Sequence, residues 1–113
     1  MHEYSIVRAL LDRVEREAGE RGATAVTQVR VAIGRQSGVE PELLRSAFEL
    51  VRAGTICDCA ELELCEIECR WECRACGDAV PAENVLRCPR CGAPARLVAG
   101  DEIMLERLEL EVA

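Results

Sequence analysis

Two Cys-x-x-Cys-Gly motifs place the strongest constraint on how this chain folds. The first runs from Cys73 to Gly77 and the second from Cys88 to Gly92. A tight turn can aim both thiolates of such a motif at one ion, and four thiolates suit tetrahedral Zn²⁺ in a closed structural site. The glycine after each second cysteine permits a positive φ and lets its amide face the sulfur. We therefore predict a structural zinc ion held by Cys73, Cys76, Cys88 and Cys91.

The segment that carries these motifs is too short to bury a core of its own. It has about 25 residues, and Pro81, Pro89 and Pro94 interrupt any long element. A closed four-thiolate site leaves no coordination position for a substrate, so we expect the cysteines to hold structure and perform no catalysis. Iron binding and a redox dithiol are the alternatives for this motif, and a redox enzyme predicts labile disulfides without stoichiometric zinc.

The rest of the chain alternates between helical and strand patterns. Apolar residues recur at helical spacing from Tyr4 to about Gly19, and again from Pro41, in the first helical turn, to about Ala53. Alternation of apolar and polar residues predicts strands over 24–33, 60–71 and 102–112, with a phase slip near Cys65 that indicates a bulge.

These patterns predict an α+β fold. A small mixed β-sheet with two helices would carry an inserted zinc-ribbon module with four cysteine ligands. We expect residues 1–69 and 98–113 to form the αβ domain and residues 70–97 to form the zinc-binding insert, just before the last strand.

Composition excludes several classes of protein. The 14 basic residues are all arginine and stand against 21 acidic ones, giving a net charge of −7 that argues against nucleic acid as the main ligand. No apolar run approaches the ~20 residues that cross a membrane, and no export signal begins the chain, so we expect a cytoplasmic location. In a reducing cytosol clustered cysteines bind metal more often than they form disulfides.

The single histidine, His2, rules out a catalytic Cys–His pair elsewhere, and we expect no enzyme activity.

The first three residues form a second candidate metal site. The α-amine of Met1 and the backbone amide and imidazole of His2 can chelate a cation that favours planar nitrogen donors, such as Ni²⁺ or Cu²⁺. Glu3 adds an oxygen or a second amide. Taken on these residues alone, the ordinary alternative is an exposed histidine at a frayed chain end.

The order of motifs along the whole chain resembles the HypA/HybF family of hydrogenase maturation factors. The motifs are Met1-His2-Glu3-Tyr4-Ser5, the segment 34–42 (Gly-Arg-Gln-Ser-Gly-Val-Glu-Pro-Glu), Ser46-Ala-Phe48, Gly54-Thr55 and the two cysteine motifs. The resemblance implies a nickel metallochaperone that binds Ni(II) at its N-terminus and cooperates with the maturation GTPase HypB. It further implies delivery to the large subunit of [NiFe]-hydrogenase, and some relatives also assist urease, which adds urease maturation factors as partners.

The resemblance also assigns roles to single residues. His2 matches the family's essential nickel ligand, through imidazole and backbone nitrogen, and Glu3 matches the second residue of that motif. Glu40 stands where some members have an aspartate that completes the nickel site. For Glu40 the alternative is helix-cap electrostatics ahead of Pro41.

Four further cysteines depart from the family pattern: Cys57, Cys59, Cys65 and Cys69. Each pair, two or four residues apart, would share a strand face and could form an auxiliary soft-metal site, or each thiol could behave as a small buried hydrophobe. The alternative function for the whole chain is a zinc-ribbon adaptor or nucleic-acid-binding factor. In that alternative, the arginines around the cysteine motifs would make the basic contacts. The other interpretation of these arginines is that they lie on a solvated surface and balance the charge of nearby glutamates.

Overall fold

The computed structural model describes residues 2–113, and its contacts divide the chain into two compact units. The first unit holds the described residues up to Ala32 together with Val39–Cys65 and Met104–Ala113. The second unit holds Ile33–Gly38 and Glu66–Ile103. It is longer than the 70–97 segment expected from the sequence, because residues 33–38, which include the end of β1, and the residues flanking that segment make their contacts within it.

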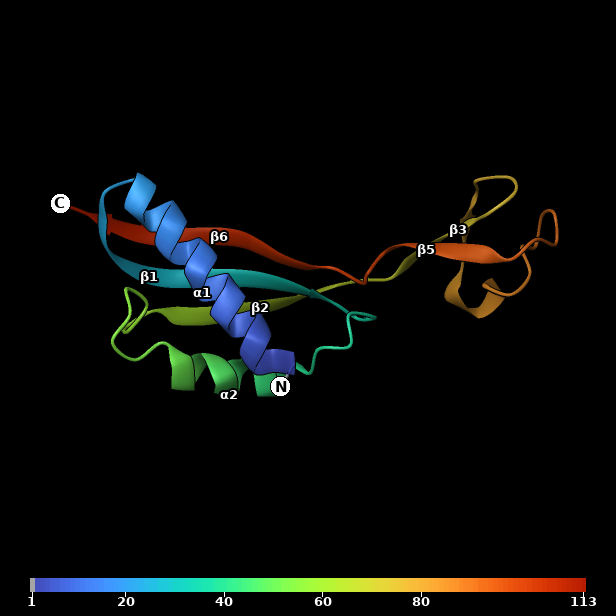
Figure 1. Cartoon of the computed structure of the whole chain (residues 1–113). Helices are drawn as coiled ribbons and strands as arrows, with labels where there is room; N and C mark the ends of the chain where they lie inside the picture. The colour runs from blue at the N-terminus through green and yellow to red at the C-terminus, as the bar shows by residue number, and fades with distance from the viewer. Residues whose placement is uncertain (1) are drawn as a thin grey trace. The chain divides into compact units, whose positions relative to one another are not determined.

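A mixed three-stranded sheet in the order β2-β1-β6 forms the body of the first unit (Figure 1). The strands are β1 (Ala23–Gly34), β2 (Glu61–Ile67) and β6 (Ile103–Val112). Side-chain bonds from β1 to β6 join residues whose numbers run in opposite senses, which makes this pair antiparallel: Thr24–Glu111, Thr27–Glu109 and Arg30–Glu106. Bonds between β1 and β2 join numbers that rise together, which makes that pair parallel: Arg30–Glu63 and Val31–Cys65.

Helix α1 (His2–Glu20) crosses one face of this sheet (Figure 1). Its buried side chains recur every three or four residues, as an amphipathic helix requires: Val7, Leu11, Val14 and Ala18. The pattern predicted this helix, although it begins at His2 rather than Tyr4. No helix in the described part of the chain has the length and apolar character needed to span a lipid bilayer.

Helix α2 (Pro41–Val51) buries Leu44 and Phe48 completely. Arg45 of α2 and the C-cap residue Arg52 donate to backbone carbonyl groups at the start of β2 and just before it. Arg45 donates to Leu62 at 3.0 Å, and Arg52 donates to Ala60 at 2.6 Å. The predicted helix is therefore confirmed, with its end at Val51 in place of Ala53.

The second unit contains a small antiparallel sheet in the order β4-β3-β5. Its strands are β3 (Arg70–Cys73), β4 (Ala79–Val80) and β5 (Ala95–Ala99), and a 3₁₀ turn spans Ala82–Asn84. The single strand expected over 60–71 is wrong. The chain leaves the first sheet after Ile67, and Arg70 pairs with Ala99 of the second sheet, so the phase slip near Cys65 precedes a strand break rather than marking a bulge within one strand.

A close crossing of two backbone segments holds residues 33–38 in the second unit. A Cβ atom at Gly34 would lie 2.2 Å from the carbonyl oxygen of Gly100, and one at Gly100 would lie 2.7 Å from the Cα of Cys69. Gly100 also has a φ of +110°, which a residue with a side chain rarely adopts. The amide of Gln36 donates to the Gly100 carbonyl at 2.7 Å. Both glycines are therefore required by close contact.

Candidate metal sites

The sulfur atoms of the four predicted zinc ligands lie together. All four Sγ atoms are within 4.8 Å of one another, with Cys73 and Cys91 3.2 Å apart and Cys76 and Cys88 3.9 Å apart. A tetrahedral zinc ion with bonds of about 2.3 Å separates its sulfur ligands by about 3.8 Å. The donor set and its spacing therefore fit Zn²⁺.

The two motifs place their cysteines at different depths. Cys73 and Cys88 are buried and pack with Val80, beside the half-buried Trp71, whereas Cys76 and Cys91 are exposed. The inner cysteine of each motif thus joins the small core and the outer one faces solvent. A metal ion in this position would crosslink the two turns and supply cohesion that so small a core lacks.

Backbone amides support the sulfur of Cys73. The amides of Cys76 and Ala75 each donate to this sulfur at 3.4 Å. The amide of Cys76 is the main cause that lowers the pKa of Cys73, to about 6, which favours the thiolate form of this sulfur. The thiolate is the form that binds metal.

The glycines of the motifs adopt the predicted backbone but a different hydrogen bond. Gly77 and Gly92 have φ values of 76° and 81°, as expected. Their amides donate to the carbonyl oxygens of Cys73 and Cys88, at 3.1 and 2.8 Å, and not to a sulfur. Amides inside the motifs face sulfur, as that of Arg90 does toward Cys88, and so do the amides of Asp78 and Ala93, which follow the two glycines.

The structure brings together two of the four predicted nickel ligands. The backbone amide of Glu40 donates to Oε2 of Glu3 at 3.3 Å. Helix α1 begins at His2, whereas Met1 lies outside the described residues. The amide of a first helical residue has no acceptor within the helix, which leaves the His2 amide outside the helical hydrogen-bond ladder.

Glu40 has a structural role that its position ahead of Pro41 anticipated. It is the N-cap of α2, and its side chain accepts a hydrogen bond from the amide of Glu42 at 3.5 Å. Glu40 therefore both caps α2 and contacts Glu3. The sequence could suggest the cap, whereas the contact with Glu3, 37 positions away, depends on how α1 and α2 pack.

The four additional cysteines do not gather into a second cluster. Within the described residues, the only close group of three or more metal-ligating side chains is the four-cysteine site. Cys57 and Cys59 lie in a turn between α2 and β2, and Cys69 follows the end of β2, so the shared strand faces predicted for these pairs are wrong. Cys57 is fully buried, as a small hydrophobe would be, whereas Cys59 is exposed.

Two arginines near the cysteine motifs form ion pairs with acidic neighbours. Arg90 pairs with Asp78, and Arg96 approaches Glu72 at 3.7 Å. Their charge is therefore balanced locally, as the solvated-surface interpretation requires. This pairing weakens the alternative in which these side chains contact a phosphate backbone.

Comparisons with known proteins identify the family. A family model described as "Hydrogenase/urease nickel incorporation, metallochaperone, hypA" matches residues 1–110. The hydrogenase maturation factor HypA of Aquifex aeolicus is 44% identical over 115 residues, covering 99% of each chain. That of Wolinella succinogenes is 43% identical over 114 residues, covering 98% of this chain and 96% of the relative.

Solved structures of this family have the same fold. The solution structure of the nickel metallochaperone HypA from Helicobacter pylori has a TM-score of 0.79 at 29% identity, covering 98% of both chains. A second solution structure of a HypA protein has a TM-score of 0.81 at 30% identity, covering all of this chain and 98% of the other. With the four-cysteine cluster and the N-terminal motif in their expected order, these matches lead to one conclusion: the chain belongs to the HypA family of hydrogenase/urease nickel incorporation metallochaperones.

Proposed function

We propose that this chain binds Ni(II) at its N-terminus and delivers it during maturation of [NiFe]-hydrogenase, while a structural zinc ion occupies the four-cysteine site. The observation that carries the proposal is the combination of full-length family membership with the N-terminal Met-His-Glu at the start of α1. The cytoplasm is the proposed location, because free thiols in such number persist in a reducing compartment.

The proposed nickel ligands are nitrogen donors of Met1 and His2, joined by Glu3. The position of His2 at the first turn of α1 supports this, because coordination through its amide removes no helical hydrogen bond. Glu3 holds the amide of Glu40, so a carboxylate is already positioned next to the N-terminal turn. We propose Glu40 as a further oxygen donor to nickel, and its link to Glu3 supports that role.

The two proposed metal sites differ in ligand chemistry, which keeps the two ions apart. Four thiolates favour zinc and leave no open position. Nitrogen donors at the first residues of a chain suit Ni²⁺ and stay open to a receiving protein. One chain can therefore retain a structural ion tightly and release a cargo ion.

The proposed partner in delivery is the maturation GTPase HypB, with the hydrogenase large subunit as recipient and urease maturation factors as further partners. A groove of about 230 Å³ beside the N-terminus supports a docking surface there. Glu3 lines this groove together with three exposed apolar side chains: Tyr4, Leu43 and Leu50. A partner bound on this surface would lie next to the proposed nickel ligands.

Metal analysis with a pull-down tests the proposal. Untagged protein should contain one zinc per chain and, after nickel loading and desalting, bound nickel as well. Leu50→Arg, on the exposed part of the groove, should abolish capture of the GTPase without changing either metal content. Nickel that appears only at the expense of zinc, or failure to associate with the GTPase with and without nucleotide, would contradict the proposal.

A further inference from the structure

Strand β6 has one unpaired edge. It pairs with β1 at the edge of the first sheet, and within the described residues no strand occupies its other side. The carbonyl oxygens of Glu109 and Glu111 accept hydrogen bonds from hydroxyl groups of β1, at 3.1 and 3.2 Å, so they point toward β1. Successive residues of a strand direct their backbone groups to opposite sides. The amides and carbonyls of Leu108, Leu110 and Val112 therefore point to the free edge.

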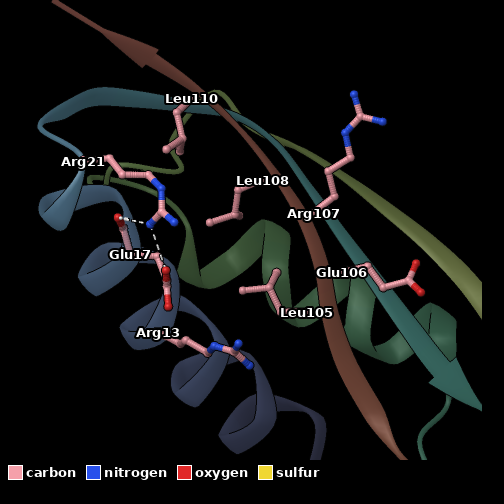
Figure 2. Close-up of a pocket in the computed structure, with 8 residues that line it drawn as sticks. All are labelled: Arg13, Glu17, Arg21, Leu105, Glu106, Arg107, Leu108 and Leu110. Atoms are coloured by element: carbon pink, nitrogen blue, oxygen red, sulfur yellow. Dashed lines mark hydrogen bonds and ion pairs between the residues drawn. The ribbon is translucent and has the colours of Figure 1, made fainter.

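A groove with a leucine floor and charged walls runs beside this edge, between α1 and β6 (Figure 2). It has a volume of about 270 Å³, and its floor consists of three half-buried leucines: Leu105, Leu108 and Leu110. Glu106 and Arg107 of β6 also line it. Figure 2 shows these leucines on the helix side of the strand, with Arg13 and the ion-paired Glu17 and Arg21 on the opposite wall. A strand added to β6 would rest its apolar side chains on this floor.

The other face of β6 is acidic. It carries Glu106, Glu109 and Glu111 with a single arginine, Arg107, which pairs with Glu109 at 3.0 Å. Glu106 pairs with Arg30 of β1 at 3.1 Å. Glu111 forms no ion pair with any described residue, so an added strand with basic side chains on this face would meet an uncompensated carboxylate.

In the register centred on Leu110, this charge pattern disfavours a second copy of the chain as the occupant. Antiparallel pairing of two β6 strands about Leu110 would set Glu109 opposite Glu111 of the other copy, twice over. Like charges directly opposite each other destabilise a strand pair, and acidic residues on an edge strand protect it from self-association. The net charge of −7 acts in the same direction.

We propose that the free edge of β6 and its groove bind an extended segment of a partner protein in which apolar residues alternate with arginine or lysine. The segment joins the sheet by strand addition, with main-chain bonds to Leu108, Leu110 and Val112. Its apolar side chains fill the leucine floor and its basic side chains face Glu109 and Glu111. The site is independent of the proposed nickel ligands, none of which lines the groove.

Fluorescence titration of the full chain with the labelled peptide acetyl-Arg-Val-Lys-Val-Arg-Val-amide tests the main-chain bonds. Val112→Pro removes an amide that points to the free edge and should weaken binding at least about tenfold. Val112→Ala keeps that amide and should change binding by less than about twofold. In amide exchange measured by NMR, the amides of Leu108 and Leu110 should exchange more slowly once the peptide is bound. Equal binding by the two variants, or unchanged exchange, overturns the proposal.

A second comparison tests the charge contacts. It also tests the proposal if Val112→Pro fails to fold. Glu109→Gln with Glu111→Gln should weaken binding more than Glu42→Gln with Glu83→Gln, which neutralises two exposed acids elsewhere. A peptide of the same composition in block order, Val-Val-Val-Arg-Lys-Arg, should bind more weakly than the alternating one. Equal effects in either comparison would show general attraction of a cation to an acidic protein and overturn the proposal. A dimer of the peptide-free chain that Val112→Pro dissociates would identify a second copy as the occupant and also overturn it.

Discussion

Oε2 of Glu3 accepts a hydrogen bond from the backbone amide of Glu40, 3.3 Å away, and so joins the first turn of α1 to the N-cap of α2. This bond ties the segment that carries the N-terminal motif to the rest of the first unit. It also places two of the proposed nickel ligands in direct contact.

Two substitutions of Glu3 separate the contribution of its hydrogen bond to stability from that of its charge. Glu3→Ala should lower the free energy of unfolding by about 1 kcal/mol, because the amide of Glu40 loses its acceptor. Glu3→Gln keeps an acceptor oxygen and should remain within about 0.5 kcal/mol of the wild type. Urea denaturation followed by helical circular dichroism measures both, because both α-helices belong to the first unit. Equal losses of stability in the two variants would show that the carboxylate charge of Glu3, and not this hydrogen bond, stabilises the fold.

The crossing of Gly34 and Gly100 should tolerate no side chain. Gly34→Ala places a Cβ atom 2.2 Å from the Gly100 carbonyl oxygen, and we expect a loss of more than about 2 kcal/mol of stability. Gly19→Ala is the matched control, because Gly19 lies in α1 with nothing within 4 Å of the added atom. That variant should gain up to about 1 kcal/mol from helix propensity. A wild-type melting curve for Gly34→Ala would mean that this contact is not tight in solution.

The buried thiol of Cys57 should make the fold sensitive to alkali. Burial raises its pKa to about 11, above the value of about 8.5 for a thiol in an unfolded chain. The folded chain therefore keeps a proton that the unfolded chain loses between these two values, and stability falls as pH rises through this window. The loss should reach about 2–3 kcal/mol near pH 11 and disappear in Cys57→Ala. Cys59→Ala, at an exposed position, should retain the full alkaline decline in a series of denaturant titrations.

Loss of zinc should unfold the second unit and spare the first. Trp71, the only tryptophan, packs against the core around Cys73, Val80 and Cys88, so its fluorescence reports on this unit alone. Cys76→Ser, or removal of metal by a chelator, should shift the Trp71 emission to the red while the helical circular dichroism of α1 and α2 persists. Cys59→Ser lies outside the cluster and should leave zinc content and emission unchanged. Native Trp71 emission in zinc-free protein would contradict a structural role for the metal.

Sequence patterns predicted what depends on local periodicity and failed where partners are distant. Both helices, the strand over β1 and the α+β class follow from spacing, and family membership confirms that the chain is a metallochaperone rather than an enzyme. The break between Ile67 and Arg70 was missed because alternation continues through it, and only pairing of Arg70 with Ala99 shows that the chain has entered another sheet. Strand β5 was missed for another reason: it is short, and it is stabilised by its pairing with the distant strand β3.

For the candidate metal sites too, local motifs were predicted correctly and contacts between distant residues were not. The cysteine motifs predicted their own cluster because each pair lies within one turn and four thiolates share one chemistry. The auxiliary cysteines were misplaced because their spacing in sequence says nothing of the turn that holds Cys57 and Cys59. The contact between Glu3 and Glu40 depends on the packing of two helices, so local patterns gave no signal for it, and only the family resemblance had linked the two residues.

The central claim is that nickel binds at the first residues of the chain, and calorimetric titration with Ni²⁺ tests it most directly. Three tag-free forms are compared: the wild type, His2→Ala and a form with residues added before Met1, which converts the amine to an amide. We predict 1:1 binding by the wild type, weakening as pH falls through about 6.5 because the imidazole must be unprotonated. Both altered forms should lose this binding while zinc content and helicity stay unchanged. Equal nickel binding by all three forms would contradict the account and place the cargo site elsewhere in the chain.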